Sequence, residues 1–107
     1  MSLDVYLEKT MLTDVYSAKI THNLGSMAKE AGIYSYLWRP DEIGITRAHE
    51  LIAPLTEAVK LMESNPGRFK AHNPPNGWGD YEGFLRWIKE YLDACKENPG
   101  AEIKVSR

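Results

Sequence analysis

The two ends of the chain alternate between apolar and polar side chains, which is typical of a strand with one buried face. Such strands are not stable in isolation, so we expect the two ends to pair in one small sheet. A shorter strand or extended segment is predicted over residues 13–19, after a linker of hairpin length at residues 9–12. The alternating apolar positions are Leu3, Val5 and Leu7 at one end and Ala101, Ile103 and Val105 at the other.

From Ile20 onward the apolar spacing becomes that of an amphipathic helix, which we expect Thr21 to cap and Gly32 to end. The next apolar run, residues 33–38, is short enough to form either a helix or a strand, and Pro40 ends it. The apolar positions of the first helix are Ile20, Leu24, Met27, Ala28 and Ala31.

A longer amphipathic stripe predicts a helix over residues 48–62, with Thr46 as its N-cap. Pro54 lies inside this stripe, and a proline in a helix interior costs ~3 kcal/mol or more. We therefore expect a kink, or two helices that meet near Ala53. One more helical turn is predicted over residues 68–70. The stripe consists of Ala48, Leu51, Ile52, Leu55, Ala58, Val59 and Met62.

The last predicted helix begins after Asp80, a good N-cap, and ends before Asn98-Pro99-Gly100. Its inward face includes Cys95, for which we expect a buried and unreactive thiol. These elements predict an α+β fold: a small sheet formed by the N-terminal and C-terminal strands, packed by three to four helices, in a single domain over residues 1–107. The inward positions of the last helix are Phe84, Leu85, Ile88, Tyr91, Leu92 and Cys95.

Composition narrows the classes of partner. The 107 residues are 43% hydrophobic and 26% charged, with a net charge of −2 and a pI of about 5.9. Because the basic residues form no run, binding to duplex nucleic acid is not expected. No apolar run reaches the ~18 residues of a membrane span. A lone cysteine and the absence of a secretory signal pattern predict a cytosolic protein.

The sequence contains no complete catalytic or metal-binding motif. The segment His49-Glu50-Leu51-Ile52-Ala53 starts like a zinc-protease helix, but Ala53 occupies the place of the second histidine. The three histidines lack mutual ligand spacing, and phosphate-binding glycine loops and serine nucleophile elbows are also missing. We therefore predict no metal, no cofactor and no catalytic residues.

The segment 71–81 is the most unusual loop of the chain, because it places Trp78 between two glycines and close to two prolines. A tryptophan in such a loop either fills the protein's own core or forms a platform for a ligand. Both alternatives remain open from the sequence.

Other candidate ligand contacts lie at a helix start and beside an aromatic residue. His22 and Asn23 stand off the apolar face of their helix, where free backbone N–H groups attract anions. Arg39 follows Trp38, and this pair favours either anion binding with stacking or a simple cation–π contact at the surface. The predicted ligand-binding residues are His22, Asn23, Trp38, Arg39, Asn76, Trp78 and Tyr81.

Several of these segments together resemble small uncharacterised proteins of phages and bacteria, over most of the chain. The resemblance rests on Thr21-His22-Asn23-Leu24-Gly25, Leu37-Trp38-Arg39-Pro40, Asn76-Gly77-Trp78-Gly79 and Val105-Ser106-Arg107. No activity is attached to that family. The resemblance implies a binder that inhibits or sequesters something, as sponges for nucleotide immune signals do.

The leading functional hypothesis is a non-enzymatic protein that binds a small anionic or nucleotide-like ligand. One alternative is an interaction module that blocks a host partner through an aromatic surface. Another is a small enzyme, which requires an acid–base pair among His22, His72, Asp80 and Glu82. Exposed edge strands and surplus aromatics on the last helix, Trp87 and Tyr91, further predict a homodimer.

Overall fold

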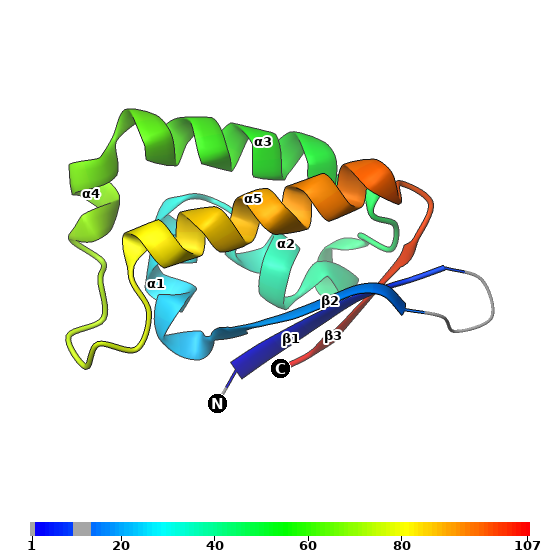
Figure 1. Ribbon diagram of the computed structural model, residues 1–107, viewed down its shortest axis with the longest axis horizontal. Helices are drawn as coiled ribbons and strands as arrows, with labels where there is room; N and C mark the ends of the chain where they lie inside the picture. Colours follow the sequence, from blue (N-terminus) through cyan, green and yellow to red (C-terminus); the bar gives the residue numbers. More distant parts are fainter. Residues whose placement is uncertain (1, 10–13) are drawn as a thin grey trace.

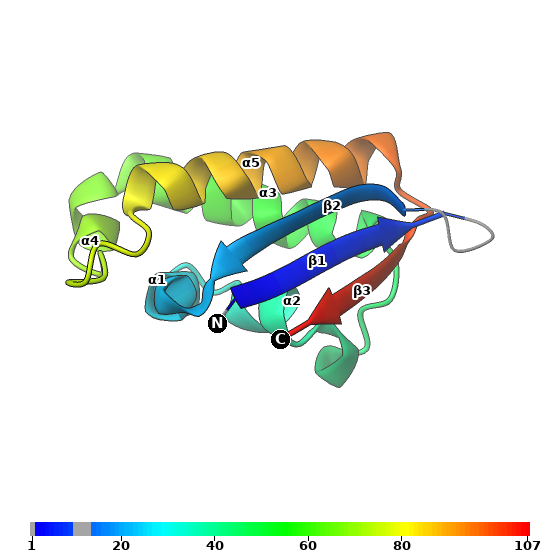
Figure 2. The same ribbon diagram turned by 60° about the horizontal axis from the view of Figure 1, so that its bottom comes forward.

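A three-stranded antiparallel sheet carries the fold, and a layer of helices covers one of its faces (Figures 1 and 2). The computed structural model describes residues 2–9 and 14–107. The predicted α+β fold and the pairing of the two chain ends are confirmed, whereas the predicted linker lies mostly outside the described residues. The strands, in the spatial order β2-β1-β3, are β1 (Ser2–Glu8), β2 (Asp14–Thr21) and β3 (Glu102–Ser106).

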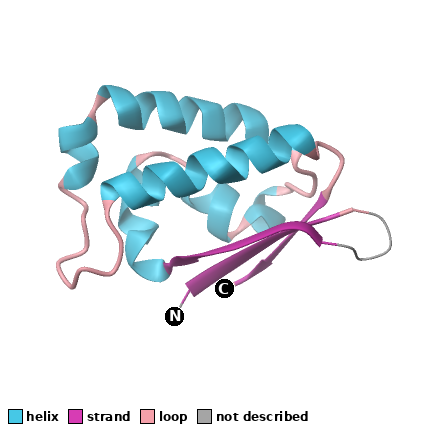
Figure 3. Cartoon of the chain, viewed as in Figure 1, coloured by secondary structure: helices cyan, strands magenta, loops and turns pink. Residues whose placement is uncertain are grey.

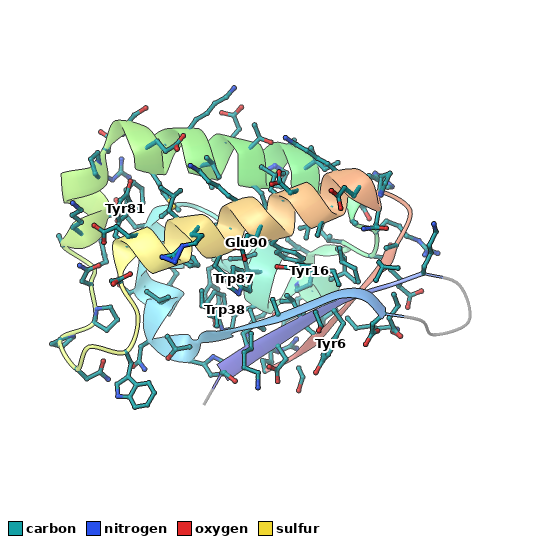
Figure 4. The ribbon with its side chains drawn as sticks, in the orientation of Figure 1. Tyr6, Tyr16, Trp38, Tyr81, Trp87 and Glu90 are labelled. Atoms are coloured by element: carbon teal, nitrogen blue, oxygen red, sulfur yellow. The ribbon has the colours of Figure 1, made fainter. Side chains whose placement is uncertain are left out.

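The sheet register determines which side chains enter the core. Val5 of β1 lies opposite Val105 of β3, and Leu3 lies opposite Ile20 of β2. Opposite residues of an antiparallel pair share a face, so the apolar positions point toward the helices. Tyr6 alternates with them and points away from the helices (Figure 4). Ile20 is therefore a strand residue, and the prediction that it belongs to the apolar face of the following helix was wrong.

Short helices connect the sheet to the helical layer (Figure 3). Thr21 Oγ1 accepts a hydrogen bond from Asn23 N at 3.2 Å, which confirms its capping role, although the capped element is a 3₁₀ turn. The ambiguous run at 33–38 is a helix. These elements are η2 (His22–Leu24), α1 (Gly25–Glu30), α2 (Tyr34–Trp38) and η3 (Pro40–Ile43).

Three further helices complete the layer, which has five α-helices in residues 2–9 and 14–107 rather than three or four. Helix α3 (His49–Ser64) runs without a break through Pro54, so the alternative of two helices was wrong. Helix α4 (Pro66–Lys70) is the predicted extra turn. Helix α5 (Tyr81–Glu97) is capped by Asp80, whose Oδ1 accepts a hydrogen bond from Gly83 N at 2.7 Å.

Thr46 does not cap α3 as predicted. The carboxylate of Glu50 reaches back instead, and its Oε1 accepts hydrogen bonds from Thr46 N at 3.0 Å and Arg47 N at 2.9 Å. These bonds hold the pKa of Glu50 below its usual range. Sequence reasoning identified the correct neighbourhood but placed the capping oxygen on the wrong side chain.

The core lies between the sheet and the helical layer, to which all five α-helices contribute buried side chains, and α3 packs against α5 (Figure 1). Tyr16 of β2 stacks on Tyr91 of α5, with ring centroids 5.8 Å apart. Trp87 is half-buried, and its indole Nε1 donates a hydrogen bond to Lys19 O at 3.0 Å, which fastens α5 to β2. Two aromatics that suggested a partner surface thus belong largely to the intramolecular packing (Figure 4).

Ile103 is 8% exposed, and it pairs with fully buried Leu7 across the two chain ends. We expect Ile103→Asp to lower the free energy of unfolding by roughly 3–5 kcal/mol, because it leaves an unpaired charge in the core. Denaturant titration measures this loss. Lys104→Gln, on the exposed face of the same strand, is the control and should unfold nearly like the parent.

Cys95 is fully buried on α5, and this burial raises the pKa of its thiol to about 12. Because the thiolate is the reactive species, we expect a disulfide reagent to label the native protein slowly and the denatured protein rapidly near neutral pH. The release of the reagent's chromophore gives both rates. Rapid labelling of the native protein would contradict the burial.

Candidate functional site

The loop between α4 and α5 presents its tryptophan to the exterior. The Trp78 side chain is 67% exposed, so the alternative in which it fills the protein's own core was wrong. The turn before it is closed by a hydrogen bond from Gly77 N to Pro74 O at 3.3 Å. Asn76 Oδ1 accepts a further hydrogen bond from Trp78 N at 3.0 Å. These contacts fix the backbone that carries the indole.

The same loop lies directly against the end of β2 and the start of η2. A Cβ atom at Gly79 would stand 2.9 Å from Leu24 Cγ and 3.1 Å from Thr21 Cγ2, so only glycine allows this approach. Asn76 Nδ2 lies 3.5 Å from Asn23 Oδ1, at the limit of a hydrogen bond. The structure therefore brings together the two segments that the sequence separates by about fifty residues.

An open hollow of about 410 Å³ lies where these segments meet the sheet. Its lining includes Trp78, two asparagines and Lys19, residue types that can supply an aromatic surface, hydrogen-bonding groups and a positive charge. Three predicted residues, Asn23, Asn76 and Trp78, line this hollow. The complete lining comprises Ser2, Lys19, Ile20, Thr21, Asn23, Asn76 and Trp78.

Two other predicted ligand contacts, buried Trp38 and half-buried His22, pair with each other. Trp38 is 2% exposed, and its Nε1 donates a hydrogen bond to His22 Nδ1 at 2.8 Å. Tyr34 stacks on the indole of Trp38, with ring centroids 5.1 Å apart. Neither His22 nor Trp38 lines the hollow, because each satisfies the other within the fold. Their assignment to the ligand site is thus not supported by the geometry.

Arg39 and Tyr81 also lie outside the hollow. Arg39 forms an ion pair with Glu42 at 2.7 Å, and the hydrogen bond that its guanidinium donates to this carboxylate raises the pKa of Arg39. Tyr81 is 6% exposed, and its hydroxyl donates a hydrogen bond to Met62 O at 2.7 Å. Tyr81 therefore joins α5 to α3 instead of facing a ligand (Figure 4).

Sequence reasoning missed Ser2, Lys19, Ile20 and Thr21 as lining residues. The signal for Lys19 was present in the alternation of β2, since Ala18 and Ile20 turn inward and Lys19 outward. Its neighbour across the sheet is Asp4. The register of β1 with β2, which places Lys19 opposite Asp4, had no clear signal in the sequence between the two strands.

The enzyme alternative requires an acid–base pair among His22, His72, Asp80 and Glu82, but these residues contact other partners. Asp80 caps α5, and Glu82 lies 3.5 Å from Lys70 Nζ, so neither is paired with a histidine. His72 instead contacts Glu30, with 3.5 Å between Nε2 and Oε1. Its other nitrogen, Nδ1, lies 2.8 Å from the Ser26 hydroxyl.

Comparisons with known proteins found no matching family model, no matching curated protein and no matching solved structure. The described residues contain no group of three or more metal-ligating side chains. None of the helices in those residues combines the length and the apolar character needed to cross a bilayer.

The close packing of Gly79 against Leu24 and Thr21 predicts how substitutions in the loop affect stability. Both Gly77 and Gly79 have positive φ, at 77° and 98°, but a Cβ would meet other atoms within 4 Å only at Gly79. We expect Gly77→Ala to cost ~1–2 kcal/mol of stability through its backbone conformation alone. Gly79→Ala should cost roughly 1–3 kcal/mol more, because Leu24 and Thr21 must move. Equal losses in denaturant titration would contradict the close packing.

Proposed function

We propose that this protein binds a small nucleotide-like ligand, with an aromatic ring and a negative charge, in the hollow beside Trp78. The observation that carries the proposal is the highly exposed indole at the rim of a hollow that also contains Lys19 and two asparagines. Ligand sites of this kind combine apolar surface with a few polar groups that fix orientation.

Each lining group supplies one part of the recognition. Stacking of a base on an aromatic side chain is worth ~1–3 kcal/mol. Asn23 and Asn76 each carry one acceptor and two donor hydrogens, which suit the polar edge of a base. Lys19 supplies the charge for a phosphate or carboxylate. Unlike Lys70, Lys89 and Lys104, it forms no ion pair with the described residues.

In this proposal the ligand is retained and released unchanged. The side chains that line the hollow include no histidine, aspartate or glutamate, so they offer no general acid or base at neutral pH. Retention without conversion fits the sequestering role implied by the resemblance to phage and bacterial proteins. A nucleotide signal would be met in the cytosol, which also suits the free thiol of Cys95.

The exposed indole also supports a second candidate, an interaction module that docks a partner protein or a second copy of the chain through Trp78. Tryptophan is enriched among the residues that dominate binding energy at protein interfaces. A small ligand and a protein partner would then compete for the same surface. Light scattering of wild type and Trp78→Ala tests docking of a second copy, since a Trp78-mediated dimer is lost in the variant.

A thermal-shift screen with purine and pyrimidine nucleotides tests the leading proposal. A ligand at 100 times its Kd should stabilise the protein by about 2.7 kcal/mol. Trp78→Ala should abolish the shift, whereas Ile43→Ala, which removes another exposed apolar side chain outside the hollow, should retain it. Mass spectrometry of the released ligand should return the added molecule unchanged. A panel with no shift in wild type would reject nucleotide binding.

A further inference from the structure

A second group of polar side chains connects α1 to the segment that contains α4 and the following loop. The Ser26 hydroxyl lies 2.8 Å from His72 Nδ1, and His72 Nε2 lies 3.5 Å from Glu30 Oε1. The second carboxylate oxygen of Glu30, Oε2, accepts a hydrogen bond from Arg68 Nε. A hydroxyl, an imidazole and a carboxylate are thus arranged in series.

The carboxylate determines which nitrogen of His72 carries the proton. Arg68, and to a lesser extent His72, lowers the pKa of Glu30, so this carboxyl is ionised at neutral pH. An ionised carboxylate favours the tautomer of His72 that carries its proton on Nε2. Nδ1 then has a free lone pair, directed at the hydroxyl of Ser26. This is the tautomer that a general base for Ser26 requires.

We propose that Ser26 is an activated nucleophile that is acylated by small carboxylic esters, with His72 as its general base and Glu30 as the residue that positions His72. A nucleophile within hydrogen-bond distance of a base, itself oriented by a third group, is the arrangement that identifies such serines. The proposal is independent of ligand binding at Trp78, because a nucleotide that carries no carboxylic ester would still be released unchanged.

The proposed reaction proceeds in two balanced steps. Ser26 Oγ forms a bond to the acyl carbon while its proton passes to His72 Nδ1, and the ester's C–O bond breaks. The leaving alkoxide takes that proton and departs as an alcohol. In the second step water attacks the acyl carbon, His72 Nδ1 accepts its proton, and the Ser26 C–O bond breaks. The acid departs and the proton returns to Ser26.

Ser26 and His72 are exposed enough for a small ester to reach them. Ser26 is exposed, and the His72 side chain is about one-third exposed, so a small ester in solution can reach both. Ser26 lies three residues after Asn23, which lines the hollow, and His72 lies four residues before Asn76. Ser26, His72 and Glu30 themselves do not line the hollow.

A fluorophosphonate probe tests the nucleophile directly, since its phosphorus forms a bond to an activated serine oxygen and releases fluoride. We expect labelling of one site, which peptide mapping assigns to Ser26. Ser26→Ala should abolish the label, whereas Ser35→Ala, which removes another exposed helical hydroxyl, should retain it. No label on wild type, or a label on another residue, would overturn the proposal.

The other two residues are tested by rescue, because loss of reactivity alone could reflect a disturbed loop. His72→Ala should lower the labelling rate by ~10²-fold or more, and added imidazole should restore part of it. Glu30→Gln should also lower the rate, and Glu30→Asp should recover part of it. Labelling of His72→Ala at the wild-type rate, or its failure to respond to imidazole while still folded by circular dichroism, would overturn the assigned base.

Discussion

The pairing of β1, at the N-terminal end of the chain, with β3, at the C-terminal end, is the interaction on which the rest of the structure depends. Strand β1 is the central strand, and its three inward side chains, Leu3, Val5 and Leu7, are fully buried. Its antiparallel partners come from residues 14–21 and 102–106, so the sheet exists only once the C-terminal segment has returned. Strand β3 in turn holds the start of α3, through hydrogen bonds from Ile103 N to Thr46 O and from Ala48 N to Ala101 O, both at 2.9 Å. The helical layer is therefore anchored to the same closure.

The other end of the sheet determines where the candidate site lies. Strand β2 ends at Thr21 and passes directly into η2, so the last outward residues of the strand and the first polar residues of the turn share one corner. The loop before α5 is pressed against that corner at Gly79. A hollow can form here because the sheet ends, the chain turns, and the loop stands alongside. None of its lining side chains is needed for the core, except that Ile20 contributes to both.

The strands and most helix ends could be predicted from the sequence because they depend on local patterns: alternation, helical periodicity and capping residues. The errors arose where two patterns overlapped. Ile20 continues the strand alternation from Ala18, but it also fits the helical spacing that follows. Its pairing with Leu3 places it in the strand. Pro54 lies in the sixth position of α3, where packing of the apolar face against α5 outweighs the lost backbone hydrogen bond.

The same distinction between local patterns and long-range contacts applies to the residues of the candidate site. Asn23, Asn76 and Trp78 were identifiable because they sit in turn-forming segments with no apolar role. Trp38 and Tyr81 lie outside the hollow, and their polar atoms are bonded to His22 and to Met62 O, sixteen and nineteen residues away. Arg39 is different, since Glu42 stands only three residues later and the pair was visible in the sequence. The contact between Ser26 and His72 spans 46 residues, and no local pattern indicates it.

The proposed ligand site accounts for the exposed indole of Trp78, whereas folding alone does not require it. Exposed tryptophan gains no burial energy, and the positive φ angles of Gly77 and Gly79 are available to few other residues. If the loop served only to connect α4 with α5, a small polar residue at position 78 would be compatible with the same backbone conformation. The hydrogen bond from Trp78 N to Asn76 Oδ1 and the contact of Gly79 with Leu24 instead hold the backbone of this side chain in a defined position. A platform that is already ordered loses less entropy when a ring stacks on it, which increases affinity without further contacts.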